Sequence, residues 1–511
     1  MSSTAIGDIS FRIYCFYRTD FRHNELGPRL NRILRNCGRA VIQAKLADLE
    51  QRPGITHEGV KRPILSFSRD CFMMNRREFL VGASAVLAAD NGLAGAANVS
   101  ELQNAARDAW LFALPLIEVA ALRSRPDPVS GKPWPVNSFS HARSLAGPMN
   151  RAVTTPNNDT LYSTAFVDTT TGPVRVEIPD CGKRYLSVQI MDMYTDNTFV
   201  LGPRTPGGAA GAWRLIAPHA EPRDARDLRL ATPHAWLVVR ILVNGPSDLA
   251  AVHAIQDRLK LDGVVAPPPL SKATRSADWP AYFAAAQELV NDDPPPFKVG
   301  RDALATIRET GSARDFSRAG YTREAAAAID AGVAEAAAAL RSVPMRAQFI
   351  DGWTYPRAAL GKYGDNIVFR AIVALVGLGA LIPAEAMYLR SAGDGLGLFN
   401  GDGLYRMSLS RPIPVDAFWS LTMYEATEDG RFFLTENALN RYSIGDRTEG
   451  LSYGQNGLLD IWIGRSDPGG ARTTNWLPAP KQGPFALTLR AYLPGPALLN
   501  GTYRLPPIIR A

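Results

Sequence analysis

Cysteine is scarce in this chain, and its few thiols are unevenly placed. The four cysteines among the 511 residues are Cys15, Cys37, Cys71 and Cys181. Three of them precede Met73, so only one remains in the rest of the chain. A single thiol cannot close an internal disulfide, and it offers no thiolate framework for a metal ion. The sequence therefore excludes a fold stapled by disulfides or zinc after Met73.

Histidine and the motifs of common enzymes are also lacking. The histidines after residue 97 are His141, His219, His234 and His253. None of them pairs at the spacing of metal ligands. His141 is a candidate general base, although a hydrogen-bonded structural role fits it better. The chain has no G-x-S-x-G elbow, nucleotide-binding P-loop or H-E-x-x-H helix. We therefore predict no nucleotide or redox cofactor and leave a divalent cation open.

Long apolar runs and a strong charge of one sign are missing from most of the chain. The most apolar stretch, residues 367–389, is interrupted by two charged residues and a proline, which favours a buried helix over a membrane span. Residues 1–73 hold 12 Lys or Arg against 7 Asp or Glu, whereas residues 98–511 hold 42 against 40. The basic charge belongs mainly to the first segment, so we predict no nucleic-acid partner.

A twin-arginine pattern occupies residues 74–97. An Arg-Arg pair precedes a weakly apolar run rich in Ala and Gly, and an A-x-A step follows. This is the layout of a cleaved signal for the twin-arginine export machinery. We therefore expect translation to start at Met73 or Met74, residues 1–73 to be a disordered mis-called start, and the protein to be periplasmic or secreted. The alternative is a genuine basic arm at residues 1–73.

The remaining pattern predicts an α+β protein with two antiparallel jelly-roll-like β modules, a helical middle region and flanking helices. Residues 97–123 carry apolar side chains at helical spacing. Short strand-like segments bounded by turn residues recur between 126 and 245 and again after 404. No repeat at a fixed period is visible. The predicted segments are 1–73, the signal peptide 74–97, the first β module with its leading helix 98–260, the helical middle 261–390 and the second β module 391–511.

Two polar clusters lie in the first β module. TTPNNDTLYS places one in a turn before a strand, and QIMDMYTDNTF places the other at a strand end. Such side chains can converge on a hard cation or a sugar, or they can form turns that satisfy backbone groups. The candidate catalytic residues are Asp159, Asp192 and Asp196, and the candidate ligand contacts are Asn157, Asn158, Tyr162, Tyr194, Asn197 and Arg204. The metal ligands are left unassigned.

A third polar cluster lies near the C-terminus, in NRYSIGDRTEGLSY and NWLPAP. Its arginines can join an ion-pair network or hold a carboxylate or phosphate in a fork. Trp476 can stack on a sugar ring or pack in the core, whereas core packing is expected for Trp419. The candidate ligand contacts here are Arg441, Tyr442, Asp446, Arg447 and Trp476.

Five strings carry a family resemblance. They are TPNNDTLYSTAFVD, MDMYTDNTFVLGPRT, FWSLTMYEA, NRYSIGDRTEGL and NWLPAPKQGPFALTLRAYLP. In this order they resemble a bacterial family with two linked modules, the domain of unknown function 1254 followed by the domain of unknown function 1214. The resemblance covers about residues 98–509. It implies two jelly-roll-like modules joined and flanked by helices, and it implies no secure activity.

Two functions are compatible with these residues. The first is an exported enzyme acting on a small polar or carbohydrate-like substrate in a cleft between the β modules, with carboxylates dividing acid and base roles. The alternative is a non-catalytic periplasmic or envelope protein that binds a ligand or assembles into a homo-oligomer. A pocket lined by all three clusters would favour a site. Clusters that each satisfy their own turn would indicate architecture.

Overall fold

The computed structural model describes residues 76–151, 154–265, 274–342, 349–391, 393, 397–400 and 402–511. For residues 76–97, 341 and 342 it describes only the backbone. The predicted mis-called start and the first residues of the predicted signal lie outside the described residues. The chain divides into two compact units, Met1–Ala83 and Ser84–Ala511, and every side chain that the structure describes belongs to the second unit.

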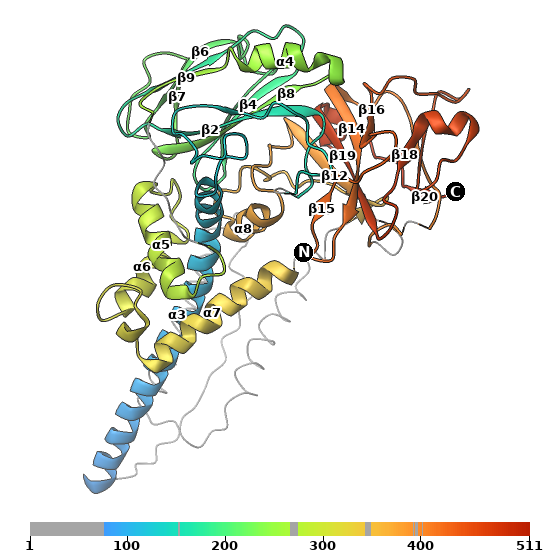
Figure 1. Ribbon diagram of the computed structural model, residues 1–511. Helices are drawn as coiled ribbons and strands as arrows, with labels where there is room; N and C mark the ends of the chain where they lie inside the picture. Colours follow the sequence, from blue (N-terminus) through green and yellow to red (C-terminus); the bar gives the residue numbers. More distant parts are fainter. Residues whose placement is uncertain are drawn as a thin grey trace, which may run out of the picture. The chain divides into compact units, whose positions relative to one another are not determined.

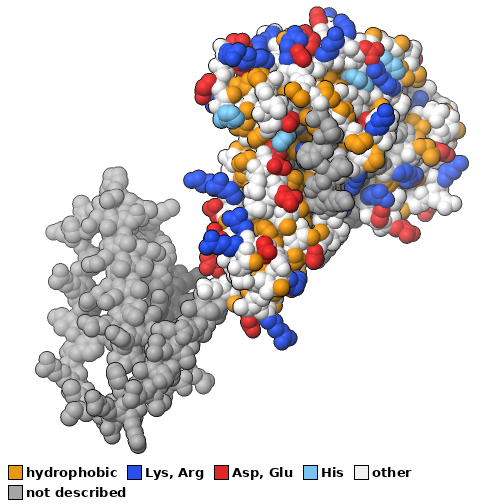
Figure 2. Space-filling model, turned by 60° about the vertical axis from the view of Figure 1, so that its left-hand side comes forward, with side chains coloured by type: hydrophobic (Ala, Val, Ile, Leu, Met, Phe, Trp, Pro, Cys, Tyr) orange, Lys and Arg blue, Asp and Glu red, His pale blue; other side chains and the backbone are white. Residues whose placement is uncertain are grey.

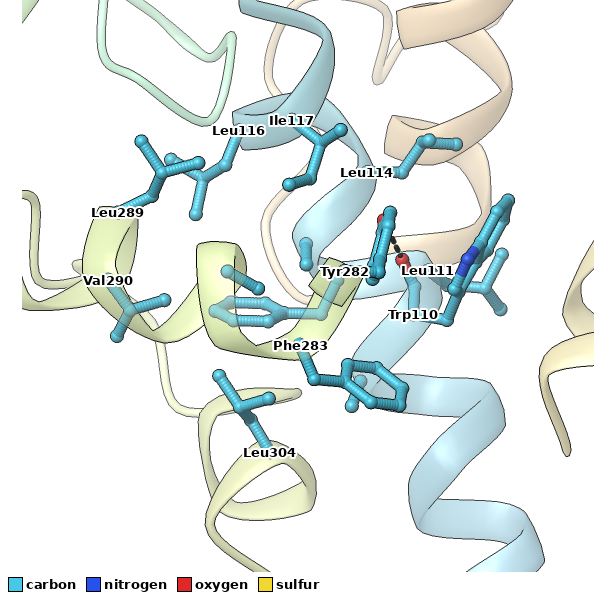
Figure 3. Close-up of a cluster of buried hydrophobic side chains, with 14 of the residues drawn as sticks. Trp110, Leu111, Leu114, Leu116, Ile117, Tyr282, Phe283, Leu289, Val290 and Leu304 are labelled. Atoms are coloured by element: carbon cyan, nitrogen blue, oxygen red, sulfur yellow. Dashed lines mark hydrogen bonds between the residues drawn. The ribbon is translucent and has the colours of Figure 1, made fainter. Parts of the chain in front are cut away.

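Helices from the N-terminal and middle segments form one layer. This layer contains α3 (Arg76–Arg123), α5 (Trp279–Asp292), α6 (Arg301–Thr310), α7 (Arg323–Ser342) and α8 (Ile367–Val376). Two further helices, α4 (Leu249–Gln256) and α9 (Pro496–Leu499), belong to the cores of the first and second β modules. The predicted helix at residues 97–123 is confirmed as the C-terminal part of α3. Its apolar face packs on α5 and α6, and the Tyr282 hydroxyl donates to the Trp110 carbonyl at 2.9 Å (Figure 3).

The first β module consists of two sheets with an apolar core between them. One sheet has the order β1-β2-β8-β4-β5 and the other β7-β6-β3-β9 (Figure 1). The strands are β1 (Ser140–His141), β2 (Thr160–Asp168), β3 (Val174–Ile178), β4 (Leu186–Met191), β5 (Asn197–Leu201), β6 (Gly211–Ile216), β7 (Asp227–Arg229), β8 (His234–Leu242) and β9 (Lys260–Asp262). Phe166 and Trp236 on the outer face of the first sheet join the core of the helical layer.

The second β module repeats this plan. Its sheets have the orders β10-β11-β12-β19-β14-β15, with β16 also on β14, and β18-β17-β13-β20. The strands are β10 (Phe349–Ile350), β11 (Trp353–Thr354), β12 (Ala386–Ser391), β13 (Tyr405–Leu409), β14 (Val415–Ala426), β15 (Phe432–Phe433), β16 (Ser443–Gly445), β17 (Leu459–Gly464), β18 (Trp476–Pro478), β19 (Phe485–Pro494) and β20 (Ile509–Arg510).

The two modules have the same connectivity. In each, the last long strand lies centrally between an earlier strand and the first strand of a hairpin: β8 lies between β2 and β4, and β19 lies between β12 and β14. The second sheets also match, since β6–β7 and β17–β18 are both parallel and the other pairs are antiparallel. The modules meet through an aromatic cluster that includes Tyr185, Phe418 and Tyr492.

The structure confirms the α+β class and corrects some details. Each module contains one parallel pair, which the antiparallel prediction did not include, and the jelly-roll detail is not confirmed. The helix predicted over residues 367–389 is wrong in extent, because α8 ends at Val376 and β12 begins at Ala386. Strands β10 and β11, and all but the last residue of β12, lie inside the predicted helical middle of residues 261–390. A short apolar run buried on both faces has no periodicity that separates strand from helix.

Acidic and basic side chains alternate over the surface. Figure 2 shows Lys and Arg interspersed with Asp and Glu on the face in view, as the balanced charge of residues 98–511 requires. None of the helices in the described part of the chain is both long enough and apolar enough to cross a membrane.

Candidate functional site

A cavity of about 370 Å³ has walls from both β modules. It lies where β2 begins, β8 ends and the β14–β16 region approaches. The lining residues are Leu145, Asn158, Asp159, Val243, Gly245, Pro246, Ser420, Asn440, Tyr442, Ser443, Gly445, Arg447 and Thr448. The first and third polar clusters of the sequence therefore meet here, but the second does not, so the predicted pocket lined by all three clusters is not found.

The centre of the cavity wall is an ion pair between the modules. Asp159 is 3% exposed, and Arg447 Nη2 donates to its Oδ1 at 2.7 Å. Ser420 Oγ donates to the other carboxylate oxygen at 2.6 Å, and Arg447 Nη1 donates to the Val243 carbonyl at 3.1 Å. Charge-assisted bonds of this kind are about twice as strong as neutral ones. Each oxygen of the carboxylate thus accepts a hydrogen bond from a protein donor.

Turns at the start of β2 and after β16 place these two charged groups. Asn157 Oδ1 accepts the Asp159 backbone N–H at 2.6 Å, and its amide nitrogen donates to the Tyr492 hydroxyl at 2.6 Å. After β16, the Gly445 N–H donates to Thr448 Oγ1 at 2.9 Å, which holds the turn that carries Arg447. Side-chain bonds of this type fix a turn where a strand stops.

The electrostatics of the cavity are close to neutral. The positive charge of Arg447 offsets that of Asp159, and Asp446 Oδ1 lies 3.6 Å from Arg447 Nε. Burial raises the pKa of Asp446 above its ordinary value, while the Arg447 charge lowers it. The charges of Asp159 and Arg447, the acidic and the basic side chain of the lining, therefore cancel, and Asp446 lies outside the lining.

The outer wall of the cavity carries neutral polar side chains. The Tyr442 hydroxyl donates to Asn440 Oδ1 at 3.2 Å, and the Asn158 amide donates to the Ala146 carbonyl at 2.5 Å. Ser443 adds a hydroxyl from β16. An amide, a phenol and hydroxyls can donate and accept hydrogen bonds, which suits a ligand with the same chemistry.

The second polar cluster lies elsewhere. Asp192 follows the C-terminal end of β4, whereas Asp159 lies beside its N-terminal end, because β2 and β4 both run antiparallel to β8. Six residues of strand span roughly 20 Å. The structure therefore does not bring Asp192 and Asp196 to the cavity with Asp159.

These two aspartates surround the buried guanidinium of Arg370. This side chain is fully buried, forms an ion pair with Asp196, and donates to the Tyr194 and Gly364 carbonyls at 2.9 and 2.7 Å. Burial, together with the Asp196 charge, raises the pKa of Asp192 to about 7. Nowhere in the described ranges do three His, Cys, Asp or Glu side chains gather as a metal-ligand group. Arg370 is the cation of this cluster.

The other sequence candidates bond to protein partners. Tyr194 donates to the Asp293 carbonyl at 2.8 Å, and Asn197 donates to the Gly361 and Ala380 carbonyls. The Arg240 guanidinium lies over the ring of Tyr162, and Arg204 donates to the Asp416 carboxylate and the Ala384 carbonyl. Arg441 donates to the carbonyls of Thr474 and Trp476, and Trp476 Nε1 donates to the Gly464 carbonyl. Trp419 is buried in the core of the second module, as expected.

Ser420 and Arg370 were not predicted. Ser420 meets Asp159 across 261 residues of sequence, and it lies in a buried strand where a serine has no distinguishing neighbour. Arg370 lies in the most apolar stretch of the chain, and that interruption was a usable signal. An arginine inside an apolar helix implies a buried acid partner, because an unpaired buried charge is strongly unfavourable.

A larger hollow of about 410 Å³ lies on the first module between the β2–β3 turn and β9. Its two arginines, Arg175 and Arg214, pair with Glu177 and Asp227, which lie outside the lining. None of the sequence candidates lines it. We favour the smaller cavity as the site because side chains from both modules converge there.

Comparison with known protein families gives a match to each of the two β modules. The family described as "Protein of unknown function (DUF1254)" matches residues 136–263, and "Protein of unknown function (DUF1214)" matches residues 385–496. The chain resembles the crystal structure of the VPA0106 protein from Vibrio parahaemolyticus with a TM-score of 0.57 and 22% identity, over 80% of this chain and 100% of that one. This likeness supports the fold alone.

A second solved structure, of an uncharacterized protein from Burkholderia cenocepacia, has a TM-score of 0.38 and 13% identity over 83% of this chain and 98% of that one. The comparison with curated proteins gave no match. The order of the two matched modules agrees with the order that the sequence strings predict. The chain therefore carries a DUF1254 module followed by a DUF1214 module, as the two-module resemblance implies.

Proposed function

We propose that the cavity between the modules binds a small, uncharged, hydroxyl-rich molecule of monosaccharide or polyol size. The observation that carries this proposal is the neutral Asp159–Arg447 pair in a concave wall of polar side chains. The volume of about 370 Å³ lies at the lower end of ligand pockets, which span about 300–1,000 Å³.

Binding fits this geometry better than acid–base catalysis. A catalytic carboxyl group needs an oxygen within reach of the proton that it moves. Both oxygens of Asp159 already accept hydrogen bonds from Arg447 and Ser420. The carboxylate thus serves to shape the wall and to hold the modules together.

Calorimetric titration with D-glucose, D-galactose, D-xylose and myo-inositol tests the proposal. We expect saturable binding of at least one of these probes. A Ser443→Trp variant should abolish it by filling the cavity, whereas Ser452→Trp, at an exposed position of the same module outside the cavity, should not. Binding that survives Ser443→Trp would show that the probes bind elsewhere.

An anionic probe tests the charge of the ligand. D-Glucuronate keeps the pyranose ring of D-glucose but carries a carboxylate. We expect it to bind more weakly than D-glucose, because the guanidinium of Arg447 is already paired. Tighter binding of glucuronate would replace the neutral ligand class with an acidic one.

We also propose that the protein is exported through the twin-arginine route. The supporting observation is the Arg76-Arg77 pair followed by an apolar run and the A-x-A step at residues 94–96. Expression from Met74 in a bacterium with this route should yield a periplasmic protein whose intact mass corresponds to a chain that begins near Ala97. An Arg76→Lys, Arg77→Lys variant should stay in the cytoplasm with its leader uncut. Equal export of both proteins would contradict the proposal.

A further inference from the structure

Two turns in the two β modules have the same sequence pattern and the same hydrogen bonds. Leu201 is followed by G-P-R-T, and Ile444 is followed by G-D-R-T. In each turn the glycine N–H donates to the threonine hydroxyl, at 2.8 Å after β5 and 2.9 Å in the turn that begins at the end of β16. The threonine N–H returns a bond to the glycine carbonyl in both turns. The turns are therefore equivalent parts of the repeated module.

The arginines of these turns cross to the opposite module in the same way. Arg447 donates to the carbonyl of Val243, just after β8, at 3.1 Å. Arg204 donates to the carbonyl of Leu493, near the end of β19, at 3.0 Å. The modules thus hold each other reciprocally, as two copies related by an approximate two-fold axis do.

The acids beside these arginines are equivalent as well. The backbone N–H of Val243 donates to the Asp159 carbonyl at 3.0 Å, and that of Leu493 donates to the Glu385 carbonyl at 2.8 Å. Asp159 directly precedes β2, and Glu385 directly precedes β12. Burial raises the pKa of Glu385, and the charge of Arg204 lowers it.

Strand register confirms the correspondence. Each first sheet carries a Tyr–Arg–Ser row across three neighbouring strands, with the arginine on the central one. The row of the first module is Tyr162, Arg240 and Ser187. The row of the second module is Tyr388, Arg490 and Ser420. The spacing between equivalent residues changes from strand to strand, which explains why no fixed period is visible in the sequence.

The repeat supplies an internal comparison for the cavity. Cavity residues whose equivalents keep the same chemistry are Asp159 (Glu385), Ser420 (Ser187), Gly445 (Gly202), Arg447 (Arg204) and Thr448 (Thr205). Cavity residues whose equivalents are apolar are Asn158 (Ala384), Tyr442 (Phe199) and Ser443 (Val200). The glycine, arginine and threonine of this group hold turns and modules together in both halves. The polar groups of the second set are not needed for that task.

We infer that Asn158, Tyr442 and Ser443 are the specificity-determining residues of the cavity. This inference rests on the proposed function. The three side chains supply an amide, a phenol and a hydroxyl, which together recognise a ligand with both donors and acceptors. The ring of Tyr442 adds an aromatic face for the C–H groups of a sugar or cyclic polyol. A linear diol has no ring whose C–H groups can lie against the Tyr442 side chain, so it is the poorer ligand.

The test converts each residue into its equivalent: Asn158→Ala, Tyr442→Phe and Ser443→Val, singly and together. Each change removes a hydrogen bond worth about 1 kcal/mol, so we expect about a fivefold loss of affinity for the best of the four neutral probes. The triple variant should lose measurable binding. Its melting temperature should stay close to that of the wild type, because the opposite half folds with these apolar residues.

A matched control makes the reverse change in the other half, Phe199→Tyr with Val200→Ser, and should leave binding unchanged. Binding that persists in the triple variant but is lost in Ser443→Trp would overturn this inference and keep the cavity as the site. A wild-type protein that binds none of the probes would overturn the proposed function and this inference together. A triple variant that unfolds would also overturn it, because these side chains would then be structural.

Discussion

Arg370 in α8 and Asp196 before β5 form an ion pair in which the guanidinium is fully buried and the carboxylate is 20% exposed. The Tyr363 N–H donates to the same carboxylate at 2.6 Å. The pair joins the first sheet to the segment that leads into the second module. The second polar cluster of the sequence therefore acts as an architectural element.

Removing the acid of this pair should be strongly destabilising. Asp196→Asn keeps the shape but leaves the buried charge of Arg370 without its partner, which costs about 3–5 kcal/mol. The free energy of unfolding, measured with urea, should fall by that amount. The control is Asp416→Asn, which removes the exposed partner of Arg204 and should cost less than about 1 kcal/mol. Equal effects would mean that the Arg370 pair is solvated.

The pH dependence of stability should report Asp192. Its pKa is raised from 3.8 to about 7 in the folded protein, mainly by burial. The folded protein therefore holds a proton that the unfolded chain releases, so stability falls as pH rises from about 4 to about 7. Asp192→Asn removes this titration. The stability of the variant minus that of the wild type should therefore be more favourable at pH 8 than at pH 4. Parallel pH profiles for the two proteins would contradict the shift.

Ser420 should matter for stability although it lines the cavity. Its hydroxyl donates to the buried Asp159 carboxylate, and a hydrogen bond to a charged group contributes about 1.5–3 kcal/mol. We expect Ser420→Ala to lower the free energy of unfolding by that amount. Ser443→Ala, a serine of the same cavity whose equivalent is a valine, should change it by less than about 0.5 kcal/mol.

The crossing of α7 over α3 requires a glycine. A Cβ at Gly332 would lie 2.2 Å from the Gln103 carbonyl oxygen, so Gly332→Ala must push the helices apart. Overpacking of this kind costs about 1–3 kcal/mol. At Gly377 the nearest atoms to an added Cβ are at 3.7 Å, and Gly377→Ala should be tolerated. Thermal unfolding of the two variants compares these outcomes directly.

Five sequence strings carried the family resemblance, and local sequence patterns predicted the class of fold. The helical spacing before Arg123 and the alternating strand segments were sufficient, because these signals depend on near neighbours. Of the five candidates in the third cluster, Tyr442 and Arg447 line the cavity, whereas Arg441, Asp446 and Trp476 do not. Whether they bind a ligand stays a prediction.

Partners distant in sequence were beyond the same reasoning. Nothing near Asp159 indicates that Arg447 neutralises it across 288 residues, or that Asp192 lies at the other end of the sheet. The duplicated turn was visible as L-G-P-R-T and I-G-D-R-T, yet unequal loop lengths hid it from a search for a fixed period. Strand pairing was needed to align the rest.

The reciprocal arginine contacts have a consequence for how the second unit unfolds. Unfolding of either module breaks the hydrogen bonds that Arg204 and Arg447 donate to carbonyls of the opposite module. It also exposes the shared aromatic cluster of Tyr185, Phe418 and Tyr492. The two modules should therefore melt cooperatively, as one calorimetric transition whose van't Hoff and calorimetric enthalpies agree. The two similar halves should therefore behave in unfolding as a single cooperative unit.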